Sequence, residues 1–114
     1  MQQHNEEVCI LLGVWGEKVI HDFFQFSLAS LLAPGNLPAL AKQYKTRFVF
    51  LTRASDIDKF KSHSAYFLLQ QHCPIEFIAI NDLIIPNNYS TTLTLAYDRA
   101  IRQTKAAMLN TYFV

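Results

Sequence analysis

The sequence has little charge and almost no excess of either sign. Only 17% of its 114 residues are charged, and 10 Lys and Arg against 9 Asp and Glu give a formal net charge of +1. Proteins that bind nucleic acid through its phosphates present clustered positive charge. No run of Lys and Arg in this chain reaches the roughly five residues typical of such a patch. The composition therefore argues against a nucleic-acid-binding surface.

The chain also lacks a hydrophobic segment of membrane-spanning length. The apolar run from Val8 to Val14 is seven residues long, whereas a helix that crosses a bilayer needs about 20. Residues 1–7 are polar and acidic and lack the positive start of a secretory signal. We therefore expect a cytoplasmic protein without a transmembrane segment. Cys9 and Cys73 are expected to be small buried hydrophobic residues, although the sequence leaves a disulfide open.

What the chain does contain is an alternation of short apolar runs and helical patterns. It is 51% hydrophobic and 13% aromatic, which is typical of a globular domain with a real core. Strands are expected at Val8–Leu12, Arg47–Thr52 and Ile75–Ile80, and helices at 17–33, 37–44, 55–71 and 90–109, with Asn36, Ser55 and Ser90 as N-caps. Strands that look buried on both faces and alternate with helices predict a mainly parallel sheet. The expected fold class is three-layer α/β, with helices on both faces of the sheet.

The end of the sequence resembles the start of a further strand. Thr111–Val114 is apolar and β-prone, and it follows the last predicted helix. We expect residues 1–114 to be one α/β domain that forms the N-terminal part of a larger one and is truncated at the fourth strand. Residues 1–7 are expected to be flexible.

A segment of eleven residues, Ser30-Leu31-Leu32-Ala33-Pro34-Gly35-Asn36-Leu37-Pro38-Ala39-Leu40, carries a resemblance. It is similar to a pattern in bacterial glycosyltransferase-like proteins of the nucleotide-diphospho-sugar transferase fold (GT-A, Rossmann-like). Thr52-Arg53 after the second strand and Tyr97–Ile101 in the last helix also resemble that family. In the family, a Pro-Asp element and a Gly-Ser follow the point reached by Val114.

The resemblance implies a nucleotide-diphospho-sugar donor bound beyond the carboxyl ends of the strands. The residues to which it assigns nucleotide binding are Gly13, Trp15, Gly16, Thr52, Arg53, Asp82 and Arg99. It implies a divalent metal, Mn²⁺ or Mg²⁺, only in a longer form, because the metal-binding element would follow the fourth strand. No catalytic residue and no metal ligand is assigned in this chain, which we expect to be inactive by itself.

Each candidate also has an ordinary structural interpretation. The turn Gly13–Gly16 fits a strand-to-helix connection with a packed tryptophan, Arg53 fits a solvated surface residue, and Asp82 fits an exposed loop carboxylate. Asp98 and Arg102 are four residues apart and predict a surface ion pair. The sequence has no Gly-x-Gly-x-x-Gly motif, phosphate-binding loop, zinc-ligand spacing or Gly-x-Ser-x-Gly motif.

An alternative function belongs to another class, a small non-catalytic α/β module that acts by association. In the GT-A strand order the first strand lies between the second and fourth, so a short fourth strand leaves part of its edge unpaired. The last helix would expose apolar surface near Leu95 and Met108. We therefore expect self-association through that strand edge.

Overall fold

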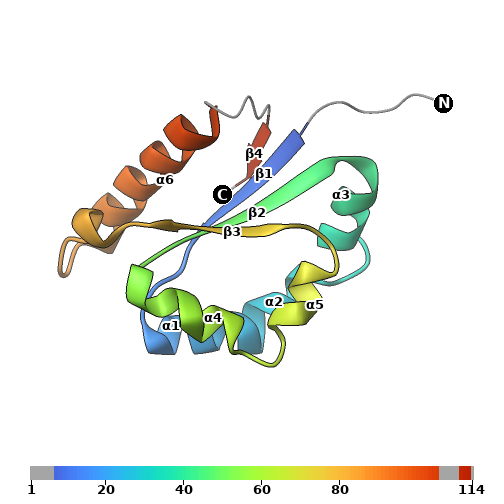
Figure 1. Cartoon of the computed structure of the whole chain (residues 1–114), viewed down its shortest axis with the longest axis horizontal. Coiled ribbons are helices and arrows are strands. Elements are labelled where there is room, and N and C mark those ends of the chain that lie inside the picture. Colours follow the sequence, from blue (N-terminus) through green and yellow to red (C-terminus); the bar gives the residue numbers. More distant parts are fainter. Residues whose placement is uncertain (1–6, 106–110, 114) are drawn as a thin grey trace.

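The computed structural model describes residues 7–105 and 111–113, and these form a three-layer α/β fold (Figure 1). The predicted flexibility of residues 1–7 falls outside the described residues except at Glu7, which begins the first strand. The strands are β1 (Glu7–Gly13), β2 (Lys45–Thr52), β3 (Ile75–Ala79) and β4 (Thr111–Phe113). The predicted fold class is confirmed.

The sheet is parallel throughout, with the strand order β3-β2-β1-β4. β1 is central, between β2 and β4, the position that the resemblance implied for it. All of β1 pairs with β2, whereas β4 pairs only with Val8, Cys9 and Ile10 of β1. Within the described residues, the half of β1 nearer its carboxyl end therefore has a strand neighbour on one side only.

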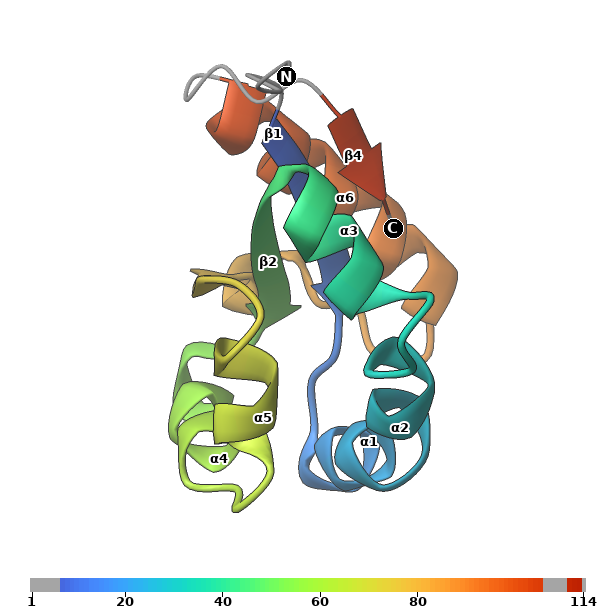
Figure 2. The same cartoon turned by 90° about the vertical axis from the view of Figure 1, so that its right-hand side faces the viewer.

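The helices divide between the two faces of the sheet. α1 (Glu17–Asp22), α2 (Leu28–Leu31), α3 (Leu37–Gln43), α4 (Ile57–Lys61) and α5 (Tyr66–Gln70) pack on one face, and α6 (Tyr89–Lys105) packs on the other. Figure 2 shows α1 with α2 and α4 with α5 as two neighbouring groups below the sheet. Since side chains along a strand alternate between faces, Phe48 and Phe50 of β2 join the core of the α1–α5 layer. Val49 and Leu51 pack under α6 instead, together with its Ala96 and Ala100.

The helix predicted at 17–33 is not continuous. A π-helical turn, Phe23–Ser27, separates α1 from α2. Phe23 and Phe24 are both buried in this turn, and their rings meet edge to face with centroids 5.3 Å apart. A π-helical turn contains one residue more than an α-helical turn. Here it occurs where two adjacent aromatic side chains are both buried against the same core.

The helix predicted at 55–71 is also broken, into α4 and α5. A 3₁₀ turn, Ala54–Asp56, precedes α4, and Ser55 does not cap the helix. Between α4 and α5 the backbone N–H of Ala65 donates to His63 Nδ1 at 3.1 Å. This local side-chain bond competes with helical bonding and stabilises a turn instead.

Of the other two predicted caps, Asn36 is in the predicted position and Ser90 is not. α6 begins at Tyr89, and Asn88 Oδ1 accepts a hydrogen bond from the N–H of Thr91 at 3.2 Å, so Asn88 rather than Ser90 caps it. The predicted end of that helix near Leu109 lies outside the described residues. Asn36 is the N-cap residue of α3, as predicted, although its side-chain amide donates to the carbonyl of Ser30 at 2.6 Å and makes no capping bond.

The turn from β1 to α1 requires glycine at position 16. Gly16 has φ 92° and ψ 141°, a conformation that is strained for any residue with a Cβ.

We predict that Gly16→Ala lowers the free energy of unfolding by about 1–3 kcal/mol. Gly35→Ala is the matched control, because a Cβ there meets nothing within 4 Å, and it should change that free energy by less than about 1 kcal/mol. Urea denaturation measures both, and equal effects would contradict the assigned strain.

Candidate functional site

The predicted site residues gather at one edge of the sheet, where the parallel strands end. Gly13 ends β1, Thr52 ends β2, and Asp82 lies just after β3. The sheet also reverses its order at β1, because β2 and β3 lie on one side of it and β4 on the other. In open parallel sheets, ligands bind outside the carboxyl ends of the strands at such a reversal. The topology therefore places the candidate site beside the turn that follows β1.

Gly13 allows α6 to pack directly over the end of β1. A Cβ at this position would lie 2.5 Å from Cδ2 of Leu93, so any larger residue would displace that side chain. The N–H of Gly13 donates to the hydroxyl oxygen of Tyr97, and the hydroxyl of Tyr89 donates to the carbonyl of Gly13, each at 3.4 Å. Both backbone groups of Gly13 thus face tyrosines of α6.

Trp15 stacks on Tyr89 at the start of α6. The ring centroids are 4.7 Å apart and the planes make an angle of 27°. A cavity of about 430 Å³ adjoins the pair, and its lining consists of Trp15, Ile84, Ile85, Pro86, Asn87, Asn88 and Tyr89. Trp15, the predicted stacking residue, is therefore half-buried, with its ring against Tyr89 and part of its side chain facing the cavity.

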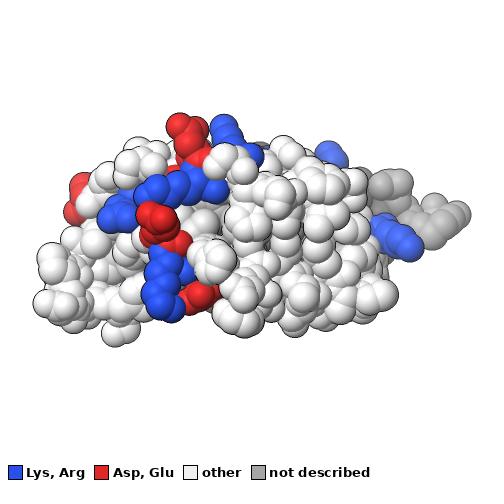
Figure 3. Space-filling view, turned by 90° about the horizontal axis from the view of Figure 1, so that it is seen from below, with Lys and Arg blue, Asp and Glu red and all other residues white. Residues whose placement is uncertain are grey.

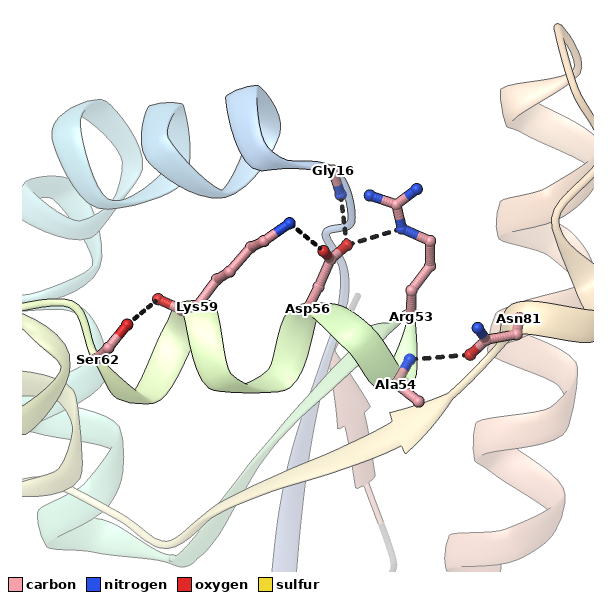
Figure 4. A network of polar contacts seen from close by, with 7 residues as sticks. All are labelled: Gly16, Arg53, Ala54, Asp56, Lys59, Ser62 and Asn81. Carbon is pink, nitrogen blue, oxygen red and sulfur yellow. Dashed lines mark hydrogen bonds and ion pairs between the residues drawn. The ribbon is translucent and has the colours of Figure 1, made fainter.

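A residue that the sequence analysis did not single out lies at the centre of the edge. The Asp56 side chain is completely buried and accepts three hydrogen bonds, shown in Figure 4. Its Oδ2 accepts from the N–H of Gly16 and from Nε of Arg53, both at 2.8 Å, and its Oδ1 accepts from Nζ of Lys59 at 3.0 Å. One carboxylate therefore links the turn after β1 to the segment after β2 and to α4.

The hydrogen bonds keep Asp56 ionised despite its burial. Burial by itself would raise the pKa of this carboxyl, but the hydrogen bonds from Arg53, Gly16 and Lys59 outweigh it and lower the pKa to about 2. Two cationic side chains share this single negative charge, so the cluster is left with one excess positive charge at neutral pH.

Arg53 and Lys59 retain hydrogen-bond donors for a ligand. Arg53 contacts Asp56 through Nε, and its terminal amino groups have no hydrogen-bond partner in the part of the chain that the structure describes. Its Nη2 lies 3.9 Å from the position of a Cβ on Gly16. The Arg53 and Lys59 side chains are 39% and 43% exposed, so the solvent reaches both. The arrangement presents a fixed guanidinium beside the turn that carries Trp15.

Thr52, in contrast, is fully enclosed. Its hydroxyl oxygen has no hydrogen-bond partner among the described residues, and its carbonyl accepts from the N–H of Ile80 at 2.9 Å. Nucleotide contact by Thr52 stays a prediction, and it would require the surrounding side chains to move.

Asp82 and Arg99 pair with each other beyond the end of β3. The guanidinium of Arg99 donates to both carboxylate oxygens of Asp82, at 2.7 and 2.6 Å, and to the carbonyl of Ala79 at 3.2 Å. The hydrogen bond from Arg99 lowers the pKa of Asp82 to about 2. The pair connects α6 to the end of β3.

The predicted surface ion pair of Asp98 and Arg102 is confirmed, with Nε of Arg102 2.9 Å from Oδ2 of Asp98.

The structure offers no reactive thiol and no metal cluster in this region. Cys9 and Cys73 do not form a disulfide, and both are buried, as predicted. They lie in the cores on opposite faces of the sheet. Burial raises the pKa of each thiol to about 11. Among the described residues, no three His, Cys, Asp or Glu side chains lie close enough together to hold a metal ion. None of the described helices has the length and apolar character needed to cross a bilayer.

We predict that Asp56→Asn lowers the free energy of unfolding by about 2 kcal/mol at pH 7, because the pKa of Asp56 falls from 3.8 to about 2 on folding. The contribution of a carboxyl with a lowered pKa is present above pH 4. It is lost as the pH falls from about 4 to about 2. Denaturant titrations across this range should show the wild-type and variant curves converging. Asp58→Asn, at an exposed position of α4, is the control, and an equal effect of both variants would contradict the prediction.

Comparison of the chain with protein-family models, with curated proteins and with solved structures gave no match. The function therefore has to be argued from the geometry of the site. That geometry consists of an aromatic pair at Trp15 and a guanidinium fixed by a buried carboxylate, both located where the sheet order reverses.

Proposed function

We propose that this chain binds the nucleotide of a nucleotide-diphospho-sugar donor, as the nucleotide-side portion of a glycosyltransferase-like domain. The observation that supports it best is the position of Trp15 and Arg53 on the loops that follow β1 and β2, at the reversal of strand order. This is the edge at which open parallel sheets bind their ligands. The resemblance of residues 30–40 to that family favours this ligand class over others.

The aromatic pair provides a surface for the base. Stacking of a nucleobase on an aromatic side chain contributes about 1–3 kcal/mol and tolerates any base. Trp15 faces the cavity of about 430 Å³, and Tyr89 supports its ring at a centroid distance of 4.7 Å. In the proposal, the base enters that cavity and contacts the indole ring.

The guanidinium provides the phosphate contact. Arg53 can donate two parallel hydrogen bonds to a phosphate through its terminal amino groups, while Nε stays bound to Asp56. The N–H groups of Gly13 and Gly16 already have partners, so the proposal assigns the diphosphate to the Arg53 side chain. Asp82 and Arg99 would contribute only after their ion pair opens.

The proposal is limited to donor binding. The described residues do not form a cluster that fits Mn²⁺ or Mg²⁺, and no residue of the chain is assigned as a catalyst. Two free, buried thiols are typical of a protein in a reducing compartment, and we place the protein in the cytoplasm on that basis.

The single tryptophan makes the proposal directly testable. Titration with UDP, GDP and their sugar conjugates, with and without manganese, should quench Trp15 fluorescence in a saturable way. Arg53→Met should weaken binding about tenfold, the usual loss for one charged hydrogen-bonding group. Arg102→Met is the control, because Arg102 lies on the exposed face of α6 and pairs with Asp98.

The absence of quenching with every nucleotide, checked by calorimetry, would contradict the proposal. Equal loss of affinity in Arg53→Met and Arg102→Met would show that binding occurs elsewhere.

Association through apolar surface is a second candidate function. Leu95 on α6 is 39% exposed, as the sequence led us to expect, while Met108 lies outside the described residues. On the other layer, Phe26 and Phe67 are 66% and 54% exposed. Isolated exposed hydrophobic residues are common, but large aromatic ones at this exposure favour contact with another surface.

We predict that the average mass measured by light scattering increases with protein concentration and that Leu95→Glu reduces this increase, because a charge opposes burial of that surface. Thr94→Glu, at an exposed neighbouring position, is the control. A monomer at all concentrations would contradict the association function.

A further inference from the structure

A second cavity lies between α1 and α4, on the side of the sheet opposite α6. Its volume is about 620 Å³, and its lining consists of Glu17, Lys18, Ile20, His21, Lys59, Ser62 and His63. It shares no lining residue with the cavity beside Trp15. Lys59 connects it to the nucleotide site, because Lys59 donates to the Asp56 carboxylate that also holds Arg53.

The charged side chains of this helical layer lie mainly on α1, on α4 and in the segment just before α4. Residues 23–41 and 62–75, which include most of the layer, contain no Asp, Glu, Lys or Arg. Figure 3 shows this surface from below, where most of the charged side chains gather in a band, a broad neighbouring area carries none, and further basic side chains lie at the right-hand end. Of these charged side chains, Glu17, Lys18 and Lys59 line the cavity.

Polar side chains line the cavity on both sides. Glu17 and His21 are four residues apart on α1, so they share one face of that helix. Lys59 lies on α4, and His63 lies in the turn that follows α4. All four line the cavity, so α1 faces α4 and its following turn across it.

His63 is held in a defined orientation. Its Nδ1 accepts a hydrogen bond from the N–H of Ala65 at 3.1 Å, and its ring stacks on Phe24 with centroids 4.0 Å apart and an interplanar angle of 9°. Because Nδ1 is the acceptor, the proton of the neutral ring is on Nε2, which is left as a donor. The cavity therefore has one fixed imidazole N–H.

Lys59 is held as well. Figure 4 shows its side chain extending from α4 into the space between α4 and α1. Its ammonium donates to Asp56 Oδ1 at 3.0 Å, which uses one of three N–H groups and leaves two for a ligand. Lys18 is less available, because its ammonium pairs with Asp22 at 2.9 Å.

We propose that this cavity binds a small phosphorylated molecule, with the phosphate between Lys59 and His63 and the organic part over Ile20. Two N–H groups of Lys59 and one of His63 give three donors from the segment 59–63, which suit the three outer oxygens of a phosphate monoester better than the two oxygens of a carboxylate. Ile20 is buried at the base of the cavity and offers apolar contact. Glu17 opposes the phosphate and limits the affinity.

The test compares phenyl phosphate with benzoate and phenol, which share a ring and differ in the polar group. Nuclear magnetic resonance of the full chain would follow the His21 and His63 rings and the amides of α1 and α4. Phenyl phosphate should shift these signals in a saturable way and more tightly than the other two compounds. Glu17→Gln should tighten binding several-fold, and Lys59→Met and His63→Phe should each weaken it about tenfold.

Lys61→Met is the matched control on α4, since the Lys61 ammonium lies over the ring of Phe77 and outside the cavity lining. His63→Phe keeps an aromatic ring that can stack on Phe24. A weaker affinity of this variant would therefore report loss of the imidazole N–H and not loss of packing. The inference is overturned if phenol or benzoate binds as tightly as phenyl phosphate, or if Glu17→Gln shows no saturable shift. Trp15 fluorescence reports the nucleotide site separately, so failure of either proposal is visible by itself.

Discussion

The buried carboxylate of Asp56 is the interaction on which the arrangement of the candidate site depends. Moving an isolated carboxylate out of water costs several kcal/mol, so the group is stable in the interior only when donors surround it. Gly16, Arg53 and Lys59 supply those donors at 2.8 to 3.0 Å. They come from the β1–α1 turn, the end of β2 and α4. Removing the charge would release three parts of the molecule together.

The same carboxylate relates the two proposed binding regions. On one side it fixes Arg53 beside the turn that carries Trp15, and on the other it fixes Lys59 at the entrance to the α1–α4 cavity. Neither cation has to be ordered by a ligand, which lowers the entropic cost of binding. Two donor sites on opposite sides of one buried anion would allow occupancy of one to affect the other through Asp56.

The sequence predicted the framework of the fold well, for physical reasons. Runs such as Val8–Leu12 and Phe48–Leu51 are apolar at every position and too short for a typical helix, which favours a strand covered on both faces. The helix interruptions were not predictable, because burial of both Phe23 and Phe24 and the bond from Ala65 to His63 arise from tertiary packing and from a local turn.

The candidate site was predicted less completely than the fold. The positions of Trp15 and Arg53 after consecutive strands followed from parallel topology, whereas Asp56 was not among the predicted site residues. A signal was present in the sequence: Asp56 lies three residues after Arg53, three before Lys59 and four before the buried Phe60. That spacing places an acid on the apolar face with a cation on each side.

The most direct test of this account is the titration of the Asp56 carboxyl carbon, followed by nuclear magnetic resonance on the wild-type chain. If the carboxylate is buried and held by three donors, its pKa is about 2, and the amide proton of Gly16 shifts with the same midpoint. A midpoint near the ordinary value of about 4, with no response at Gly16, would show that the three segments are not joined there and would contradict the account.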